Sequence, residues 1–237
     1  MQSYFAEIQH LLSKVSEQEQ GQIESASKLI AECFQKGGIL QLFGCGHSHL
    51  LAQDAYYRSG GLVPIRPITI EPLMLHFGAL TSSKNEKDPA FITNHLDSFA
   101  FKKNDILLVI STSGCNPVPI DVALLGKEAG ITVISLQSLE YCKQPTRHES
   151  GYRLEDVADL VLNTHVPVGD GLLSLQDVQY GPASTVIGSA ILHALFSQVI
   201  ESFDMGKLPV FQSANISANQ TANLELIDQY KDRIDFK

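Results

Sequence analysis

The chain has 237 residues, 44% of them hydrophobic, and a formal net charge of −9. A chain of this length can bury one substantial core, so we expect a single domain. The acidic balance argues against a nucleic-acid or anionic-membrane partner, because no basic surface is available to neutralise phosphates. An anionic small molecule stays compatible, since helix N-termini and backbone N–H groups bind phosphate inside acidic proteins.

The cysteines and the N-terminus both indicate a cytoplasmic protein. The four cysteines form no Cys-x-x-Cys pair and are widely spaced, at Cys33, Cys45, Cys115 and Cys142. We expect reduced thiols, because a chain of this size does not need disulfides for stability. Residues 1–14 carry no basic segment followed by an apolar run, so no secretory signal is predicted.

The chain opens with two amphipathic helices, predicted from apolar residues at helical spacing. They end at Gly37-Gly38, a pair typical of a helix C-terminus. Five short apolar runs follow, at residues 39–43, 63–70, 105–110, 131–136 and 157–162. Each run predicts a buried strand, although Pro64 and Pro67 make the second an irregular or edge strand.

Strands that alternate with helices predict right-handed crossovers and a doubly wound parallel sheet of five strands, an α/β fold. Residues 80–103 are polar and without clear periodicity, as in an excursion that lines a site. Residues 185–203 predict a long buried helix. One domain is therefore expected over 1–237, with N-terminal helices at 1–37, a core at 38–207 and a helix-bearing tail at 208–237.

Two polar turns follow predicted strands and precede predicted helices. The first has Gly44 and Gly46, where a backbone can approach a ligand closely, followed by His47 and Ser48. The second has three hydroxyls, a glycine and a capping-type asparagine, namely Ser111, Thr112, Ser113, Gly114 and Asn116. In a parallel sheet both turns lie at the ligand-binding edge. They predict a phosphate site, although the same residues could merely cap helices.

This pair of turns resembles the sugar isomerase (SIS) domain family, whose pattern is Gly-x-Gly-x-Ser after the first strand and Ser-x-Ser-Gly after a later one. The chain is similar to phosphoheptose isomerase and to an uncharacterised bacterial group with Ser-x-Ser-Gly-x-Asn-Pro, here Ser111 to Pro117. The resemblance extends over most of the chain. It implies a flavodoxin-like three-layer sandwich and a homodimer or homotetramer. It also implies a phosphorylated sugar held by the second turn, residues 111–117, which we call the serine turn.

The catalytic groups of phosphoheptose isomerase are only partly matched. That enzyme has an essential glutamate on the helix after the first turn, and counting from Gly44 places Arg58 there. Arginine cannot serve as a base. The resemblance also implies a histidine on the late helix, for which His193 is the candidate; a core histidine is the alternative.

Acid–base groups for sugar chemistry are Glu and His. Glu71 ends the second strand run and is the predicted base, with His76 five residues on and His47 and His49 flanking Ser48. Protonated imidazoles could pair with a phosphate, or these histidines could simply be loop residues. No pattern supports a metal site, and no cofactor is predicted.

Asp170, between Gly169 and Gly171, could hydrogen-bond sugar hydroxyls or form an ordinary turn. The sequence thus favours a sugar-phosphate isomerase. A non-catalytic phosphosugar sensor and a sugar-phosphate lyase or etherase stay open. An NAD(P)-binding oxidoreductase is disfavoured, because His49 stands where a dinucleotide-binding turn needs its third glycine.

Overall fold

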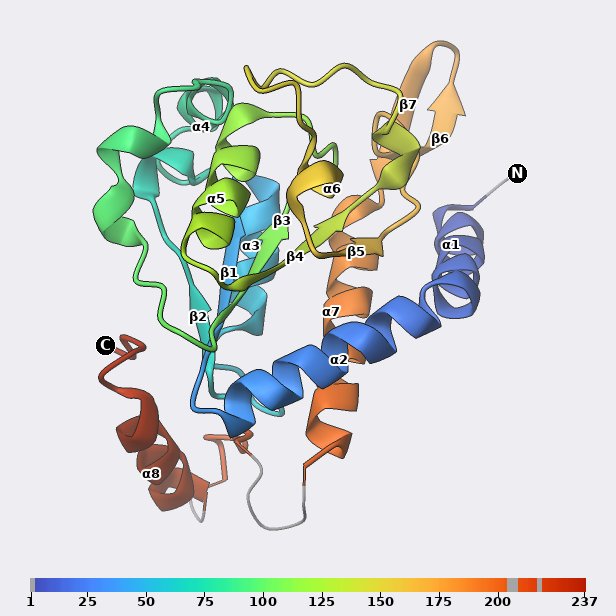
Figure 1. Ribbon diagram of the computed structural model, residues 1–237. Helices are drawn as coiled ribbons and strands as arrows, with labels where there is room; N and C mark the ends of the chain where they lie inside the picture. The colour runs from blue at the N-terminus through green and yellow to red at the C-terminus, as the bar shows by residue number, and fades with distance from the viewer. Residues whose placement is uncertain (1–2, 204–208, 217–218) are drawn as a thin grey trace.

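The computed structural model describes residues 3–203, 209–216 and 219–237. Its centre is a five-stranded sheet (Figure 1), formed by β1 (Leu40–Gly44), β2 (Ile65–Pro67), β3 (Ile106–Ile110), β4 (Thr132–Gln137) and β5 (Leu160–Asn163). The spatial order is β2-β1-β3-β4-β5 and every neighbouring pair is parallel. This is the flavodoxin-like order, so the predicted fold is confirmed.

Helices cover both faces of the sheet, which makes three layers (Figure 1). One face carries α1 (Tyr4–Gln18), α2 (Gln20–Gln35), α3 (His47–Ala55) and α7 (Ser184–Glu201), and the other carries α5 (Pro117–Glu128) and α6 (Leu154–Val157). Successive side chains of a strand point to opposite faces. Leu108 accordingly packs on the α2–α7 side, and Leu107 and Val109 pack on the α5 side.

The predicted strand run with two prolines gives the shortest strand in the sheet. β2 has three residues and lies at the edge, as its sequence predicted. The last predicted strand run, residues 157–162, is a strand only in its second part. Residues 154–157 form α6, and Leu160–Asn163 form β5. The predicted parallel strands are therefore all present, with bounds shifted by a few residues.

Two further features were not predicted. Antiparallel strands β6 (Gly171–Leu175) and β7 (Val178–Pro182) form a hairpin beyond β5. The second feature is a set of short 3₁₀ turns: η1 (Glu71–Leu73) before the polar excursion, η2 (Ile92–Asn94) and η3 (Leu96–Ser98) within it, and η4 (Leu139–Tyr141) after β4. The excursion begins with the short helix α4 (Ala79–Asn85). Both α4 and the hairpin lie at the same end of the sheet in Figure 1.

The predicted tail helix is α8 (Gln220–Tyr230), which lies at the opposite end of the molecule from α4 (Figure 1). Residues after it are fixed to the body: Ile234 is buried, and the ring of Phe236 stacks on Tyr56 at 5.8 Å between centroids. Arg233 forms an ion pair with buried Asp105 at 2.7 Å. The C-terminal segment is thus an integral part of the fold.

One helix in the described part of the chain, α7, is long and apolar enough to cross a membrane by length and composition alone. Its apolar residues have another explanation, since Ile187, Ile191 and Leu195 are buried against the sheet-side helices. A core helix of a water-soluble protein passes the same test, so the composition of α7 is weak evidence for a membrane.

Candidate active site

A cleft of about 450 Å³ lies at the carboxyl ends of the strands. Both predicted turns contribute to its wall, through Gly46, His47 and Ser48 and through Ser111, Thr112 and Ser113. The excursion and the hairpin region close the other sides; their lining residues include Ser82, Ser83, Glu86, Tyr141, Asp170 and Ser184. The fold therefore brings together two turns that are more than 60 residues apart in the sequence.

Two carbonyl groups of the serine turn accept hydrogen bonds from residues that do not line the cleft. The backbone N–H of Ser138 donates to the Thr112 carbonyl at 2.9 Å, and that of Leu154 donates to the Gly114 carbonyl at 2.9 Å. In the described residues, the backbone N–H groups of Thr112 and Ser113 have no protein acceptor. Unpaired N–H groups beside hydroxyls form an anion-binding concavity.

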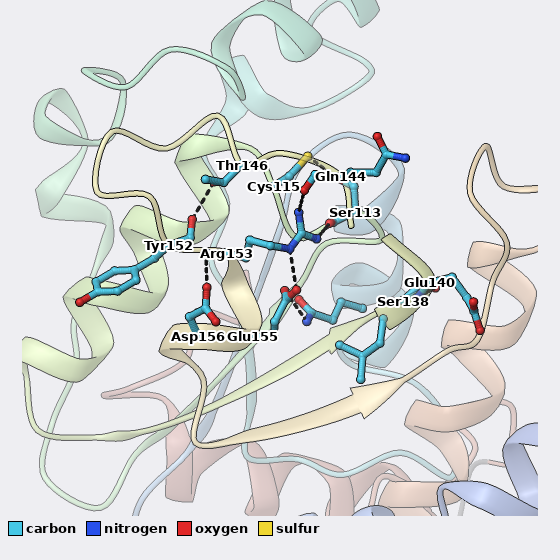
Figure 2. A network of polar contacts seen from close by, with 12 residues as sticks. Ser113, Cys115, Ser138, Glu140, Gln144, Thr146, Tyr152, Arg153, Glu155 and Asp156 are labelled. Carbon is cyan, nitrogen blue, oxygen red and sulfur yellow. Dashed lines mark hydrogen bonds and ion pairs between the residues drawn. The ribbon is translucent and has the colours of Figure 1, made fainter. Parts of the chain in front are cut away.

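Arg153 holds the serine turn in place through hydrogen bonds of its guanidinium group (Figure 2). Its guanidinium donates from Nη2 to the Ser113 carbonyl at 2.6 Å, from Nη1 to the Gln144 carbonyl at 2.7 Å, and from Nε to Glu155 Oε1 at 2.6 Å. The Arg153 side chain is only 11% exposed. A buried guanidinium with three acceptors fixes the direction of the Ser113 peptide.

Gly114 is required by both conformation and space. Its φ is +59°, and a Cβ added there would lie 2.6 Å from Gln137 Oε1 and 3.1 Å from Glu155 Oε2. Gln137 and Glu155 are joined to each other by a hydrogen bond of 2.9 Å from the Gln137 amide. A side chain at position 114 would therefore push against the group that holds Arg153.

The first turn reaches the cleft through two glycines and the start of α3. Gly44 lets the chain pass close to the start of α3, because a Cβ there would lie 2.7 Å from the Ser48 carbonyl carbon. Gly46 has a φ of +54° and is the N-cap of α3. His47 is exposed at the cleft wall. The helix begins at His47, and its first two residues, His47 and Ser48, line the cleft.

His49 cannot supply the positive charge that the sequence suggested. Its ring is buried, its Nε2 lies 2.8 Å from the Gln53 side-chain amide, and its Nδ1 has no partner among the described residues. Burial, with a smaller contribution from the charge of His76, lowers the pKa of His49 to about 4. The imidazole is neutral at pH 7.

Glu86 is one of the two carboxylates that line the cleft, with Asp170, and the sequence analysis did not single it out. It follows α4 and accepts a hydrogen bond of 2.7 Å from Asn116 Nδ2. Burial raises the pKa of Glu86, and the Asn116 hydrogen bond only partly offsets that effect. A carboxyl group with a raised pKa in a ligand cleft is a candidate for proton transfer.

Asn116 stands at the N-cap of α5, yet its side chain does not cap the helix. Its amide binds Glu86, and its Oδ1 accepts a hydrogen bond of 2.6 Å from Arg147. The capping interpretation from the sequence is therefore wrong for this residue. Asn116 positions Glu86 at the cleft and does not line the cleft itself.

Asp170 borders the cleft with its carboxylate already engaged. Oδ1 accepts hydrogen bonds from the backbone N–H of Ala183 and Ser184, and Oδ2 accepts one of 2.8 Å from the Ser184 hydroxyl. Asp170 has a φ of +66°, so the turn interpretation also holds. It fixes the start of α7 beside the cleft.

Glu71 and His76 lie outside the cleft. Glu71 begins η1 and is exposed, and His76 is exposed in the loop before α4. The second strand ends at Pro67, four residues before Glu71, so the chain has already left the sheet edge there. In the described ranges, no group of three His, Cys, Asp or Glu residues is placed to hold a metal ion.

His193 forms a separate cluster between α7 and α3. Its Nε2 lies 2.9 Å from Asp54 Oδ2 and 3.1 Å from Arg58 Nη1, and Arg58 also pairs with Asp54 at 2.5 Å. The His193 side chain is 40% exposed, so it is not a core histidine. The three side chains are absent from the cleft wall.

Fold and site define a class: a flavodoxin-like α/β protein with a polar cleft at the carboxyl edge of its sheet. The SIS domain model matches residues 3–138, and the chain belongs to that family. It is 54% identical, over all of its length and 98% of the relative, to a protein of Lysinibacillus sphaericus named UPF0309 protein in nagA 3'region.

Solved structures show the same fold at low sequence identity. Phosphoheptose isomerase from Neisseria gonorrhoeae superposes with a TM-score of 0.57 at 18% identity, over 82% of this chain and 94% of that one. The NanR protein of Vibrio vulnificus, solved as a complex with ManNAc-6P, superposes with a TM-score of 0.54 at 14% identity, over 95% of this chain and 67% of that one.

Proposed function

We propose that the protein binds a phosphorylated sugar and catalyses an acid–base reaction on it, of the sugar-phosphate isomerase type. The observation that carries the proposal is the meeting of the serine turn with Glu86 in one cleft. Membership of the SIS family supports a phosphosugar ligand, as does the ManNAc-6P bound by the similarly folded NanR.

The phosphate is assigned to the serine turn. In the described residues, no Lys or Arg lines the cleft, so apart from any charge on His47 the phosphate charge is met by dipoles. The N–H groups of Thr112 and Ser113, with the hydroxyls of Ser111, Thr112 and Ser113, supply them. Because Arg153 and its partners fix the peptides beforehand, binding requires little reorganisation of the turn.

Glu86 takes the role that the sequence gave to Glu71. An aldose–ketose isomerisation moves a proton between adjacent carbons, and a single carboxyl group can remove and return it. Asn116 holds the Glu86 side chain in place, and burial raises the pKa of Glu86, which makes its carboxylate a stronger base than an exposed one. Lyase or etherase chemistry begins with the same proton abstraction, so the reaction class is proposed at this level.

The test is Glu86→Gln, which removes proton exchange and keeps size and hydrogen bonding. The substrate is a sugar phosphate that the wild-type chain binds and converts. We expect its turnover to fall by about 100-fold or more, while its dissociation constant changes by less than about threefold. A matched control is Glu71→Gln, expected to retain activity. Loss of activity in Glu71→Gln alone would return the role to Glu71.

A phosphosugar sensor is the second candidate, because Arg58 occupies the position of the family's essential glutamate and His193 is tied to Asp54 and Arg58. A sensor binds the same ligand without converting it. Binding by the wild-type chain with no product, across sugar phosphates that stabilise the protein, would favour the sensor and exclude the role of Glu86 in catalysis.

A further inference from the structure

A second cavity, of about 510 Å³, lies between the edge strand β2 and the C-terminal segment. α8 stands at the end of the sheet opposite α4 and the β6–β7 hairpin (Figure 1), so this cavity is remote from the cleft. Its wall combines three apolar side chains with four cationic residues and two carboxylates, so the side chains of the wall carry an excess of positive charge; they are Ile227, Ile234 and Phe236, then Arg66, Lys231, Arg233 and Lys237, then Asp232 and Asp235. Its size falls within the range of small-molecule sites, about 300–1,000 Å³.

Arg66 carries a charge without a carboxylate partner among the described residues. Its Nη1 donates to Gln41 Oε1 at 2.7 Å and its Nη2 donates to the Ser98 carbonyl at 3.1 Å, both neutral acceptors. Burial lowers the pKa of Arg66 and the nearby Arg233 lowers it further, while the charge of Asp105 partly offsets both effects. A half-buried guanidinium beside another cation is an unfavourable arrangement unless an anion joins it.

The one buried carboxylate nearby is already saturated. Asp105 Oδ2 accepts hydrogen bonds from Arg233 at 2.7 Å, from the Gln41 amide at 2.9 Å and from the Lys102 backbone at 2.9 Å. Asp105 Oδ1 accepts one from the Ile39 backbone at 3.1 Å. Asp105 therefore pairs directly with Arg233 and offsets the charge of Arg66 only in part, without forming an ion pair with it.

We propose that this cavity is a second ligand site, which binds a phosphate-bearing small molecule with an apolar or ring portion. The phosphate would lie between the remaining donors of Arg66 and Arg233, which favour planar, bidentate recognition of oxyanions. The ring portion would lie against Phe236 and Ile234. A bound ligand would join the C-terminal segment to β2, so occupancy would stabilise that segment. The proposal does not depend on the function of the cleft.

The test is a calorimetric titration of the full chain with inorganic pyrophosphate. Arg66→Gln should weaken binding by about tenfold or more, and Arg66→Lys, which keeps the charge and loses the planar fork, by a smaller factor. The control is Lys28→Gln, which removes one exposed charge from α2 and should leave the affinity unchanged.

The result has clear alternatives. Absence of pyrophosphate binding to the wild-type chain would overturn the proposal. Equal affinity in wild type and both Arg66 variants would also overturn it, and would assign any binding to another surface. Ser113→Ala distinguishes that surface: binding lost in Ser113→Ala and retained in Arg66→Gln places the pyrophosphate in the cleft. If Arg66→Gln does not fold, Arg66→Lys alone decides the question.

Discussion

Replacement of Arg153 with Met should destabilise the protein and disable the serine turn together. Methionine keeps the apolar stem and removes the guanidinium, which leaves Glu155 as a buried carboxylate without its ion pair. The two side chains are 11% and 16% exposed. Removal of one partner from a buried pair costs about 3–5 kcal/mol of the free energy of unfolding. For a chain of this size, that corresponds to a fall in Tm of about 6–20 °C.

Two measurements separate this effect from an ordinary loss of charge. Arg58→Met removes an arginine from an exposed pair with Asp54 and should cost at most about 1 kcal/mol. The double variant Arg153→Met with Glu155→Gln should be more stable than Arg153→Met alone, because it leaves no unpaired buried carboxylate. Denaturant unfolding followed by circular dichroism gives the free energies.

Affinity for the sugar phosphate should fall with stability, because the Ser113 carbonyl loses its donor and the turn can rotate. The reasoning is refuted if Arg153→Met unfolds at the same denaturant concentration as Arg58→Met and binds the sugar phosphate as the wild type does. These two results together would mean that the hydrogen bonds drawn in Figure 2 do not support the turn.

Other perturbations test further parts of the site. Gly114→Ala should lose about 1–2 kcal/mol from its positive φ alone, and more from contact with Gln137, with binding abolished in calorimetry. Because the pKa of folded Glu86 is raised, its carboxyl group costs stability as pH rises through that pKa; Glu86→Gln should therefore gain in Tm relative to wild type at pH 8 and not at pH 4. His49, with its pKa lowered to about 4, should show no NMR titration between pH 5 and 8, and its contribution to stability should be lost as pH falls from about 6.5 through 4. A His49 shift change centred near pH 6.5 would contradict its burial.

The sheet could be predicted from sequence because each strand is a continuous apolar run bounded by glycine or polar residues. Pro64 and Pro67 even identified the edge strand, since a proline cannot donate to a central ladder. The hairpin at residues 171–182 was missed, although two β-prone runs around Gln176-Asp177 are a recognisable signal. Its exposed residues gave no burial pattern.

The serine turn was found from sequence and the carboxylate was not. The turn has a local signature of hydroxyls and glycine between a strand and a helix. Glu86 lies in a polar stretch like many surface glutamates, and only tertiary packing brings it to Asn116, 30 residues away. The hydrogen bond from Arg153 to the Ser113 carbonyl joins residues 40 positions apart, so no local sequence pattern indicates it either.

The most direct test of a phosphosugar cleft is the melting temperature of the wild-type chain and Ser113→Ala with sugar phosphates and with the same sugars lacking phosphate. A ligand at about 100 times its dissociation constant stabilises by about 2.7 kcal/mol, a clear rise in Tm. We expect that rise for at least one sugar phosphate, none for its unphosphorylated form, and its loss in Ser113→Ala. Equal stabilisation by both forms, or no loss in Ser113→Ala, would contradict the assignment of the phosphate to the serine turn.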